Sequence, residues 1–337
     1  LHMSNTILMS FKKIIPGLSL SVAVAICGKL LALLLPKLGA ATLAILLGIL
    51  LGNTFFKQAS LADGTKFSES RLLEYSVVLL GLTVTFQTIG QMGVKGLIFI
   101  MLLMTIVIVG AYLLGRKRGF YEKMALMMAG GNAVCGSSAI GAIAPAIEAD
   151  DNQKGQIITL VNLLGTVMML TLPFLGIHLF DGALFAKSAL LGGTLQSVGQ
   201  VVAGASLVNA ETVKFSMLFK ITRIIFLVVV VFVFEQKVRR DQLVTTKNAK
   251  KKFPIPWYVL GFLLACVVNS FLPLPAFFNQ GAHFISSWYE TIALAAIGLR
   301  LDFRKFLKEG PRLLIYGLSG GSLQTIAAVA VIFLLHI

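Results

Sequence analysis

Nine apolar runs, each long enough to cross a lipid bilayer, dominate this sequence. A hydrocarbon core of roughly 30 Å requires about 20 apolar residues per helix. The runs occupy approximately 14–35, 39–56, 71–90, 95–115, 155–180, 212–236, 256–274, 283–301 and 311–337. Two more segments, 121–148 and 182–210, are apolar but are interrupted by glycine-rich polar stretches. Because lipid satisfies no backbone hydrogen bonds, the runs predict an all-α polytopic membrane protein with about 9–11 transmembrane helices.

The composition supports a single membrane domain over residues 1–337. Hydrophobic residues make up 57% of the chain and charged residues only 13%, whereas soluble proteins carry about 25% charged residues. We expect the core elements at 71–210 and 283–337. Leu1 and His2 precede Met3 and are interpreted as an expression scar.

Basic residues form three clusters between apolar runs, although the net charge of +15 would also suit a nucleic-acid-binding protein. Cytoplasmic loops of membrane proteins carry an excess of Lys and Arg, and the clusters follow that pattern. They predict a bacterial inner-membrane protein with a cytoplasmic N-terminus, an external C-terminus and no nucleic-acid partner. The clusters comprise Arg116, Lys117, Arg118 and Lys123; Lys237, Arg239, Arg240, Lys247, Lys250, Lys251 and Lys252; and Arg304, Lys305, Lys308 and Arg312.

An ungapped alignment of residues 81–98 with 298–315 gives six identities. In the topology above, the matched helices have opposite orientations. Inverted repeats are typical of secondary transporters, which bind substrate near the midplane at discontinuous helices. Chance matches in an apolar alphabet are the alternative interpretation.

The two irregular segments contain the sequences GGNAVCGSSAIGA at 130–142 and GGTLQSVGQVVAG at 192–204. Glycine permits unwinding there, and free amides at the amino ends of half-helices hold anions. We predict two broken or re-entrant helices; the basic loops do not decide between crossing the membrane and turning back. The alternative is close helix packing through small residues, as in GxxxG contacts.

Charged residues inside apolar runs are functional candidates, because burying an ionisable group in a membrane is costly. Lys220 and Arg223 lie one helical turn apart and share a face. Arg223 is the preferred ligand for an anion, whereas Arg300 lies near the end of a run and is expected to extend to the interface. Glu74 and Glu290 begin equivalent helices and are expected to be interfacial.

The predicted substrate-binding residues are Asn132, Cys135, Gly136, Ser137, Ser138, Thr194, Gln196, Ser197, Gln200, Lys220, Arg223 and Arg300.

The sequence resembles the YeiH-type family, whose members are named as sulfate exporters. The resemblance covers nearly the whole chain. It rests on GNAVCGSSAIGAIAPAI (131–147), GTLQSVGQVVAG (193–204), KITR (220–223) and AIGLRLDF (296–303). It implies a distant relationship to the sodium/proton antiporter and bile-acid symporter superfamily, two helical bundles, an inverted repeat and elevator-type alternating access.

One position departs from the family pattern. Where the family commonly has Ile-His-Asp, this chain has Leu195, Gln196 and Ser197. The titratable pair is absent, which argues against proton coupling through these positions.

These observations predict a secondary active transporter, in the export direction, for a small anion such as sulfate, an organosulfonate or a carboxylate. Na⁺ or H⁺ is the expected coupling ion, and no other cofactor is expected. The expected partners are the anion, the bilayer and a second copy in a homodimer. An anion channel and a non-transporting membrane sensor or structural protein are the alternatives. Enzyme function is not expected, because HExxH, GxSxG, Walker A and CxxC motifs are absent.

Overall fold

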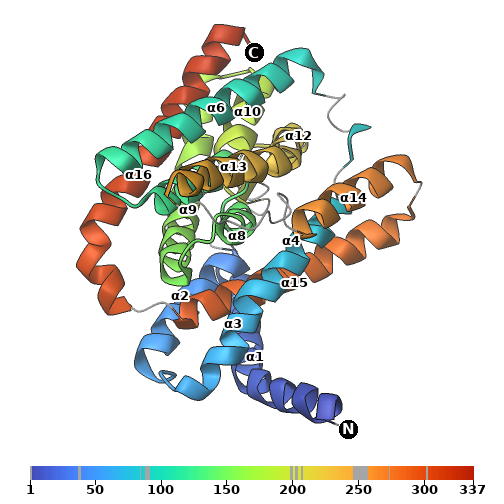
Figure 1. Ribbon diagram of the computed structural model, residues 1–337. Coiled ribbons are helices and arrows are strands. Elements are labelled where there is room, and N and C mark those ends of the chain that lie inside the picture. Colours follow the sequence, from blue (N-terminus) through green and yellow to red (C-terminus); the bar gives the residue numbers. More distant parts are fainter. Residues whose placement is uncertain are drawn as a thin grey trace.

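A computed structural model describes residues 2–36, 39–83, 85–87, 92–197, 200–201, 204–205, 208–245, 257–272, 274–300 and 303–337. Every regular element in these ranges is helical (Figure 1). The α-helices are α1 (His2–Leu34), α2 (Ala40–Thr54), α3 (Ala62–Phe67), α4 (Leu73–Gly81), α6 (Gly93–Lys117), α7 (Glu122–Ala133), α8 (Ser137–Ala146), α9 (Asp151–Leu179), α10 (Leu184–Thr194), α12 (Ala210–Ile225), α13 (Leu227–Thr245), α14 (Trp257–Phe271), α15 (Ala276–Arg300) and α16 (Phe303–Leu335). A 3₁₀ turn, η1 (Ala59–Leu61), and a π-helical segment, η2 (Ser68–Leu72), adjoin α3.

The helices confirm the prediction of an all-helical polytopic membrane protein. Each of the nine apolar runs contains at least one helix. Within the described residues, five helical stretches are long and apolar enough to cross a membrane. They are Lys12–Leu34, Gly93–Lys117, Asp151–Leu179, Glu211–Arg240 and Gly310–Leu335. Residues 88–90 of the third run and Lys247–Lys252 of the longest basic loop lie outside the described residues.

Contacts divide the helices into two bundles (Figure 1). The scaffold bundle contains α1, α2, α3, α4, α14 and α15, and the hairpin bundle contains α6 to α10, α12, α13 and α16. Within the scaffold bundle, α2 and α15 meet at glycines. A Cβ atom on Gly298 would lie 2.3 Å from the carbonyl oxygen of Ile45, and that glycine also faces Gly48. This approach brings two helix backbones into direct contact.

The predicted core ranges do not coincide with either bundle. Range 71–210 begins with α4, and range 283–337 begins within α15, yet both helices pack in the scaffold bundle. The repeat alignment includes residues 84, 88–91 and 301–302, which lie outside the described residues. The chain nevertheless passes from scaffold to hairpin bundle twice in the same way, from α4 to α6 and from α15 to α16.

Segment 121–148 folds back on itself as a hairpin, which we call hairpin 1. Helix α7 runs to a turn at residues 134–136, and α8 then runs back beside α7 in the opposite direction. A Cβ on Gly130 would lie 2.1 Å from Cδ1 of Ile143, thirteen residues later. At the open end, Lys123 Nζ donates to the carbonyl oxygen of Glu148 at 2.7 Å. Both ends of the segment therefore lie on one face of the protein, a question that the basic loops left open.

The tip of hairpin 1 depends on Gly136. Its φ of 67° lies in the left-handed region, which glycine adopts without the steric cost that a Cβ imposes. A Cβ at this position would also lie 3.1 Å from Cβ of Gln196 in the other irregular segment. The two irregular segments thus touch at their tips.

Segment 184–209 also turns back on itself, and we call it hairpin 2. Along α9, Gly176 faces Leu190, Gly165 faces Gln196 and Gln200, and the main chain at Met169 faces Gly204. The chain therefore passes along α9 in one direction over α10 and returns over residues 200–201 and 204–205. Helix α12 then starts beside the beginning of α10, where Phe185 packs on Phe215.

Helix α9 connects the hairpins and separates their points of entry. It contains 29 residues and spans about 43 Å at 1.5 Å per residue. Its amino end is capped by Asp150, whose carboxylate accepts from the amides of Asn152 and Gln153. Hairpin 1 enters beside this end of α9 and hairpin 2 beside the other. The tips meet near Val161 and Gly165, in the middle of the helix.

Members of the three basic clusters lie on one face of the protein. Arg312 Nε donates to the carbonyl oxygen of Arg118 at 3.0 Å. Lys237 pairs with Glu122, the first residue of α7, at 2.7 Å. Parts of all three basic clusters thus lie where hairpin 1 enters, which is the arrangement that cytoplasmic loops require. We refer to this side as the basic face.

Candidate functional site

The two hairpin tips meet around a buried lysine. Lys220, on α12, is fully buried, and its ammonium donates to three backbone carbonyl oxygens. The acceptors are Val134 at 2.8 Å in hairpin 1, and Leu195 at 3.1 Å and Gln196 in hairpin 2. All three N–H groups of the ammonium therefore bind main chain, and they tie one tip to the other.

Arg223 repeats this arrangement one turn later. Its side chain is also buried, and it makes four hydrogen bonds to carbonyl oxygens at the carboxyl ends of α7 and α10. The acceptors are Asn132 at 2.6 Å, Ala133 at 2.9 Å, Leu195 at 3.0 Å and Gly192 at 3.1 Å.

A cation at a helix carboxyl end meets unpaired carbonyls and the negative end of the helix dipole. Lys220 and Arg223 place such cations at the carboxyl ends of α7 and α10 at once. The sequence correctly paired the two residues on one face of α12. In this conformation Arg223 holds the main chain of the tips, with most of its donors committed.

A network of side-chain amides lies beside the cations. Gln324, a buried residue of α16, donates to the carbonyl oxygens of Asn132 at 2.9 Å and Thr194 at 2.8 Å. Gln196 donates to Oδ1 of Asn132 at 3.0 Å and to Oε1 of Gln324 at 3.3 Å. Within the described part of the chain, Asn132 Nδ2 and Gln196 Oε1 are buried without a hydrogen-bond partner. The tips therefore retain one donor and one acceptor for a further group.

The polar residues of hairpin 2 are held locally. Ser197 and Gln200 form a reciprocal capping box: the amide of Ser197 donates to Gln200 Oε1, and the amide of Gln200 donates to Ser197 Oγ, both at 3.1 Å. The Thr194 hydroxyl donates back to Leu190 in its own helix at 2.6 Å. Gly165 on α9 provides the space that the Gln200 side chain occupies.

Hairpin 1 presents two hydroxyls at the amino end of α8, and both hold a carboxylate. Ser137 Oγ donates to Glu290 Oε1 at 3.1 Å, and the Ser138 hydroxyl also hydrogen-bonds Glu290. Glu290 belongs to α15 of the scaffold bundle. Cys135 is a buried free thiol between this site and the cations. The expectation that Glu290 begins its helix is wrong, because α15 begins at Ala276 and places this residue in mid-helix.

Glu74, the equivalent acid at the start of α4, lies away from the tips. It pairs with Arg71 at 3.1 Å and accepts from the indole of Trp257 at 3.1 Å. Such partners are typical of a helix end at the membrane interface.

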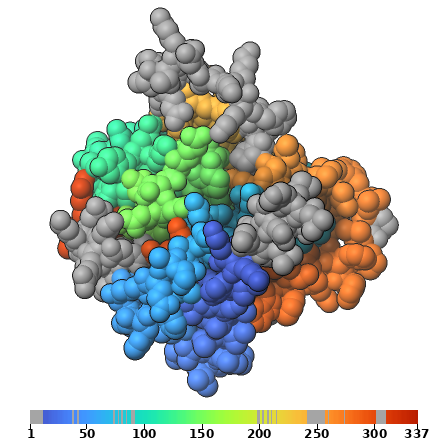
Figure 2. Space-filling model, turned by 60° about the horizontal axis from the view of Figure 1, so that its bottom comes forward, coloured from blue at the N-terminus to red at the C-terminus, as the bar shows by residue number. Residues whose placement is uncertain are grey.

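Arg300 lies apart from the tips, at the carboxyl end of α15. Its guanidinium pairs with Glu69 at 2.6 Å and donates to the carbonyl oxygen of Ala62 at 3.0 Å. Lys154 of α9 pairs with the same Glu69 at 2.9 Å and with Asp151 at 3.1 Å. This ion cluster joins the scaffold bundle to the hairpin bundle near the basic face. Figure 2 shows the two bundles adjoining, the green surface of the hairpin bundle beside the blue N-terminal helices.

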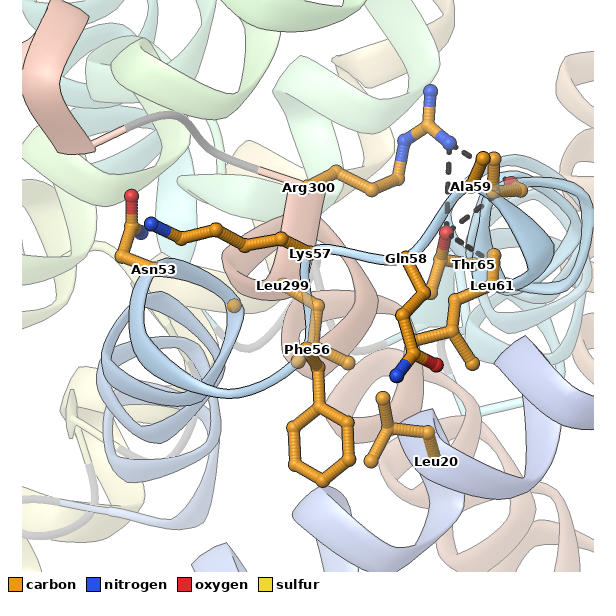
Figure 3. A pocket seen from close by; sticks show the side chains of 12 residues that line it. Leu20, Asn53, Phe56, Lys57, Gln58, Ala59, Leu61, Thr65, Leu299 and Arg300 are labelled. Atoms are coloured by element: carbon orange, nitrogen blue, oxygen red, sulfur yellow. Dashed lines mark hydrogen bonds between the residues drawn. The ribbon is translucent and has the colours of Figure 1, made fainter.

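An open cavity of about 530 Å³ adjoins the Arg300 end of this cluster. Figure 3 shows Arg300 directed toward Ala59 and Thr65, whereas Lys57 extends toward Asn53 and Phe56 points away from both. The structure therefore gathers eleven of the twelve predicted site residues at or beside the tips and places Arg300 elsewhere.

Glu290 and Gln324 were absent from the predicted site. The available signal for Glu290 was a single acid in an otherwise apolar run. For Gln324 it was one amide among the small and apolar residues of the last run.

Known proteins match the chain over nearly its full length. Residues 16–317 match the family described as "Conserved hypothetical protein 698". A UPF0324 membrane protein of Lactiplantibacillus plantarum is 56% identical, covering 97% of this chain and 99% of its own length. The UPF0324 membrane protein YdhF of Lactococcus lactis is 49% identical, covering 96% and 99%. A UPF0324 membrane protein of Clostridium perfringens is 43% identical, covering 98% of each chain.

Proposed function

We propose that this chain, which belongs to the family described as Conserved hypothetical protein 698, is a secondary transporter of a small anion. The observation that carries the proposal is the meeting of two opposed hairpins around buried cations. Discontinuous helices that meet at mid-depth are the usual substrate site of secondary transporters. Here the hairpins belong to one bundle and lie against another, which suits movement of one bundle past the other in an elevator-type cycle.

The charge of the site favours an anion over a cation. Lys220 and Arg223 are at most 1% exposed and, within the described residues, bind carbonyl oxygens rather than carboxylates. Carbonyl dipoles and two helix carboxyl ends offset part of the cost of burying two cations. Glu290 supplies one negative charge nearby, so the tips keep an excess of positive charge that a transported anion would neutralise.

We place the anion at the amino end of α8. The first amides of a helix lack partners within the helix, and the hydroxyls of Ser137 and Ser138 lie at the same end. Asn132 Nδ2, a buried donor without a partner, supplies a further hydrogen bond. Lys220 and Arg223 then act through their field and by fixing the tips, while the hydroxyls and amides contact the anion.

A channel is the principal rival. The tips tie to one another through six carbonyl oxygens, and a Cβ on Gly136 would meet Gln196. This closed contact between the tips favours alternating access over a continuous pore. Sulfate, organosulfonates and small carboxylates are the proposed substrates, with transport in the export direction and coupling to Na⁺ or H⁺. A homodimer in the inner membrane is the proposed assembly, with a cytoplasmic N-terminus and an external C-terminus.

Counterflow in proteoliposomes distinguishes these mechanisms. Vesicles loaded with unlabelled sulfate should take up radiolabelled sulfate transiently against its gradient, with saturation. Sulfite, sulfonates and small carboxylates should compete according to affinity. A channel gives neither saturation nor counterflow, and absence of flux for every one of these anions would exclude the proposed substrate class.

The variant Ser138→Ala connects the flux to the site. Loss of one hydrogen bond should weaken anion binding by about 1 kcal/mol, or roughly fivefold. Arg300→Lys is the matched control, because Arg300 lies outside the tips and should leave the affinity unchanged.

A further inference from the structure

The contact between Glu290 and hairpin 1 crosses the boundary between the bundles. Glu290 stands on α15 of the scaffold bundle, and Ser137 and Ser138 begin α8 of the hairpin bundle. Any movement of one bundle past the other must break the 3.1 Å bond from Ser137 to Glu290. The state of this carboxylate therefore bears directly on whether the bundles can move.

Glu290 also lies deep in the protein. It is fourteen residues after Ala276 and ten before Arg300 on α15, or about 21 Å and 15 Å along the helix axis. The residue is half-buried rather than fully enclosed. An ionisable residue at such depth is costly and is by default functional.

The charged neighbours of Glu290 leave it without a close counter-ion. Lys220, Lys29, His283 and the Cys135 thiol act on it electrostatically. Lys220 is committed to carbonyl oxygens, and Lys29 of α1 contacts Ser287 at 3.4 Å and the Trp288 ring at 4.5 Å. Within the described residues Glu290 has no ion-pair partner, so neutral hydroxyls make its direct contacts.

We propose that Glu290 is a proton-binding site of the transport cycle. This inference rests on the proposed function and names its coupling ion. As a carboxylate, Glu290 accepts from both serines and holds hairpin 1 against α15. A proton from the aqueous side adds to a carboxylate oxygen and removes the charge, so the serine hydroxyls turn to the entering anion. The same proton leaves on the other side after the anion, and no other bond is made or broken.

The charges at the tips give the sign of the coupling. Ionised Glu290 offsets one of the two positive charges of Lys220 and Arg223, and its protonation restores both. Anion binding therefore takes up a proton, and anion affinity rises as the pH falls. For one linked proton the change is at most tenfold per pH unit. The expected result is symport of one proton with each anion. Because an inward proton gradient then drives uptake, this coupling replaces the export direction proposed above with import whenever the proton gradient is inward.

Infrared titration of the purified protein tests the proton site without any substrate. We expect a carboxylic-acid C=O stretching band that grows as the pH falls, is lost in Glu290→Gln and is kept in Glu74→Gln. Glu74 is the matched control, because it is also an acid in an apolar run, but it has its own partners at a helix end away from the tips. A titrating band that is unchanged in Glu290→Gln would overturn the proposal.

Hydrogen exchange over residues 131–142 tests the release of hairpin 1. After correction for intrinsic rates, exchange should become faster at low pH in the unmodified protein and be fast at every pH in Glu290→Gln. If Glu290→Gln fails to fold, Glu290→Asp keeps a titratable acid and should retain the pH dependence. Protection that is independent of pH, or that follows Na⁺ instead, would contradict the proton assignment.

Sulfate flux separates this inference from the proposed function. In proteoliposomes, an inward proton gradient should drive sulfate accumulation in the unmodified protein, whereas Glu290→Gln should exchange sulfate without accumulating it. Proton-driven accumulation by Glu290→Gln would refute the coupling role and leave the transport function standing. If neither protein moves sulfate while Glu290 titrates and releases hairpin 1, the proposed substrate fails and the proton site stands.

Discussion

Replacing Arg223 with lysine isolates the role of the guanidinium from its charge. Arg223 reaches four carbonyl oxygens, two in each hairpin. A lysine at the same position keeps the positive charge but has a single nitrogen and a shorter reach. We expect it to retain two of the four carbonyls at most, one of them on each side in the best arrangement.

The magnitude follows from the carbonyls that are left unpaired. The carbonyl oxygens of Asn132 and Leu195 keep Gln324 and Lys220 as donors, so the loss falls on those of Ala133 and Gly192. Each buried polar group without a partner costs about 1–3 kcal/mol, so leaving both unpaired costs about 2–6 kcal/mol. The loss should appear as easier local opening of both tips. Even the lower end corresponds to roughly 30-fold faster exchange, because each 1.36 kcal/mol is a factor of ten.

Hydrogen exchange with mass spectrometry on peptides covering 131–140 and 190–197 measures this effect in the absence of any anion. The control is Arg300→Lys, because this partly exposed arginine lies away from the tips and its partners are Glu69 and Ala62. It should leave both peptides protected. Unchanged exchange in Arg223→Lys would show that the guanidinium does not hold the tips together, and Arg223 would return to the role of a direct anion ligand.

Three further expectations concern the frame around the site. Gly298→Ala should destabilise the scaffold bundle by about 1–3 kcal/mol, because its Cβ would overlap a carbonyl of α2 at 2.3 Å; an unchanged melting temperature would contradict this. Lys154→Met leaves Glu69, 2% exposed, with one cation fewer and should loosen the bundles near the basic face, seen as faster exchange over 66–72; unchanged protection there would show that the ion pair is dispensable. In whole cells, a cysteine replacing Gln280 should react with an impermeant thiol reagent and one replacing Arg118 should not, and the reverse pattern would invert the proposed topology.

The spans were predictable because hydropathy is the constraint that lipid imposes most directly. Each of the nine apolar runs contains at least one helix in its described residues. The course of segment 121–148 was not predictable, because its charges are compatible both with a segment that crosses the membrane and with one that turns back to the side where it entered. The contact between Lys123 and Glu148 decides it, and that contact exists only in the folded chain.

The site was recovered in part for a similar reason. A spacing of three residues placed Lys220 and Arg223 on one face, but their acceptors lie up to 91 residues away in the sequence, where no local pattern indicates them. Glu290 was misplaced because hydropathy started its helix at 283. The uncharged stretch from Ala276 extends α15 by about two turns. This extension moves Glu290 from the expected start of the helix to its middle.

The residues that hold the hairpin tips together come after both hairpins in the chain, which has a consequence for biosynthesis. Both hairpins are synthesised before α12, so the six carbonyl oxygens that Lys220 and Arg223 bind have no partner when hairpin 2 leaves the ribosome. Gln324 follows about 100 residues later still. In hydrocarbon each unpaired carbonyl costs several kcal/mol. A nascent chain that ends before α12 therefore cannot hold its hairpins tip to tip, and docking of the tips must wait for the later helices to insert.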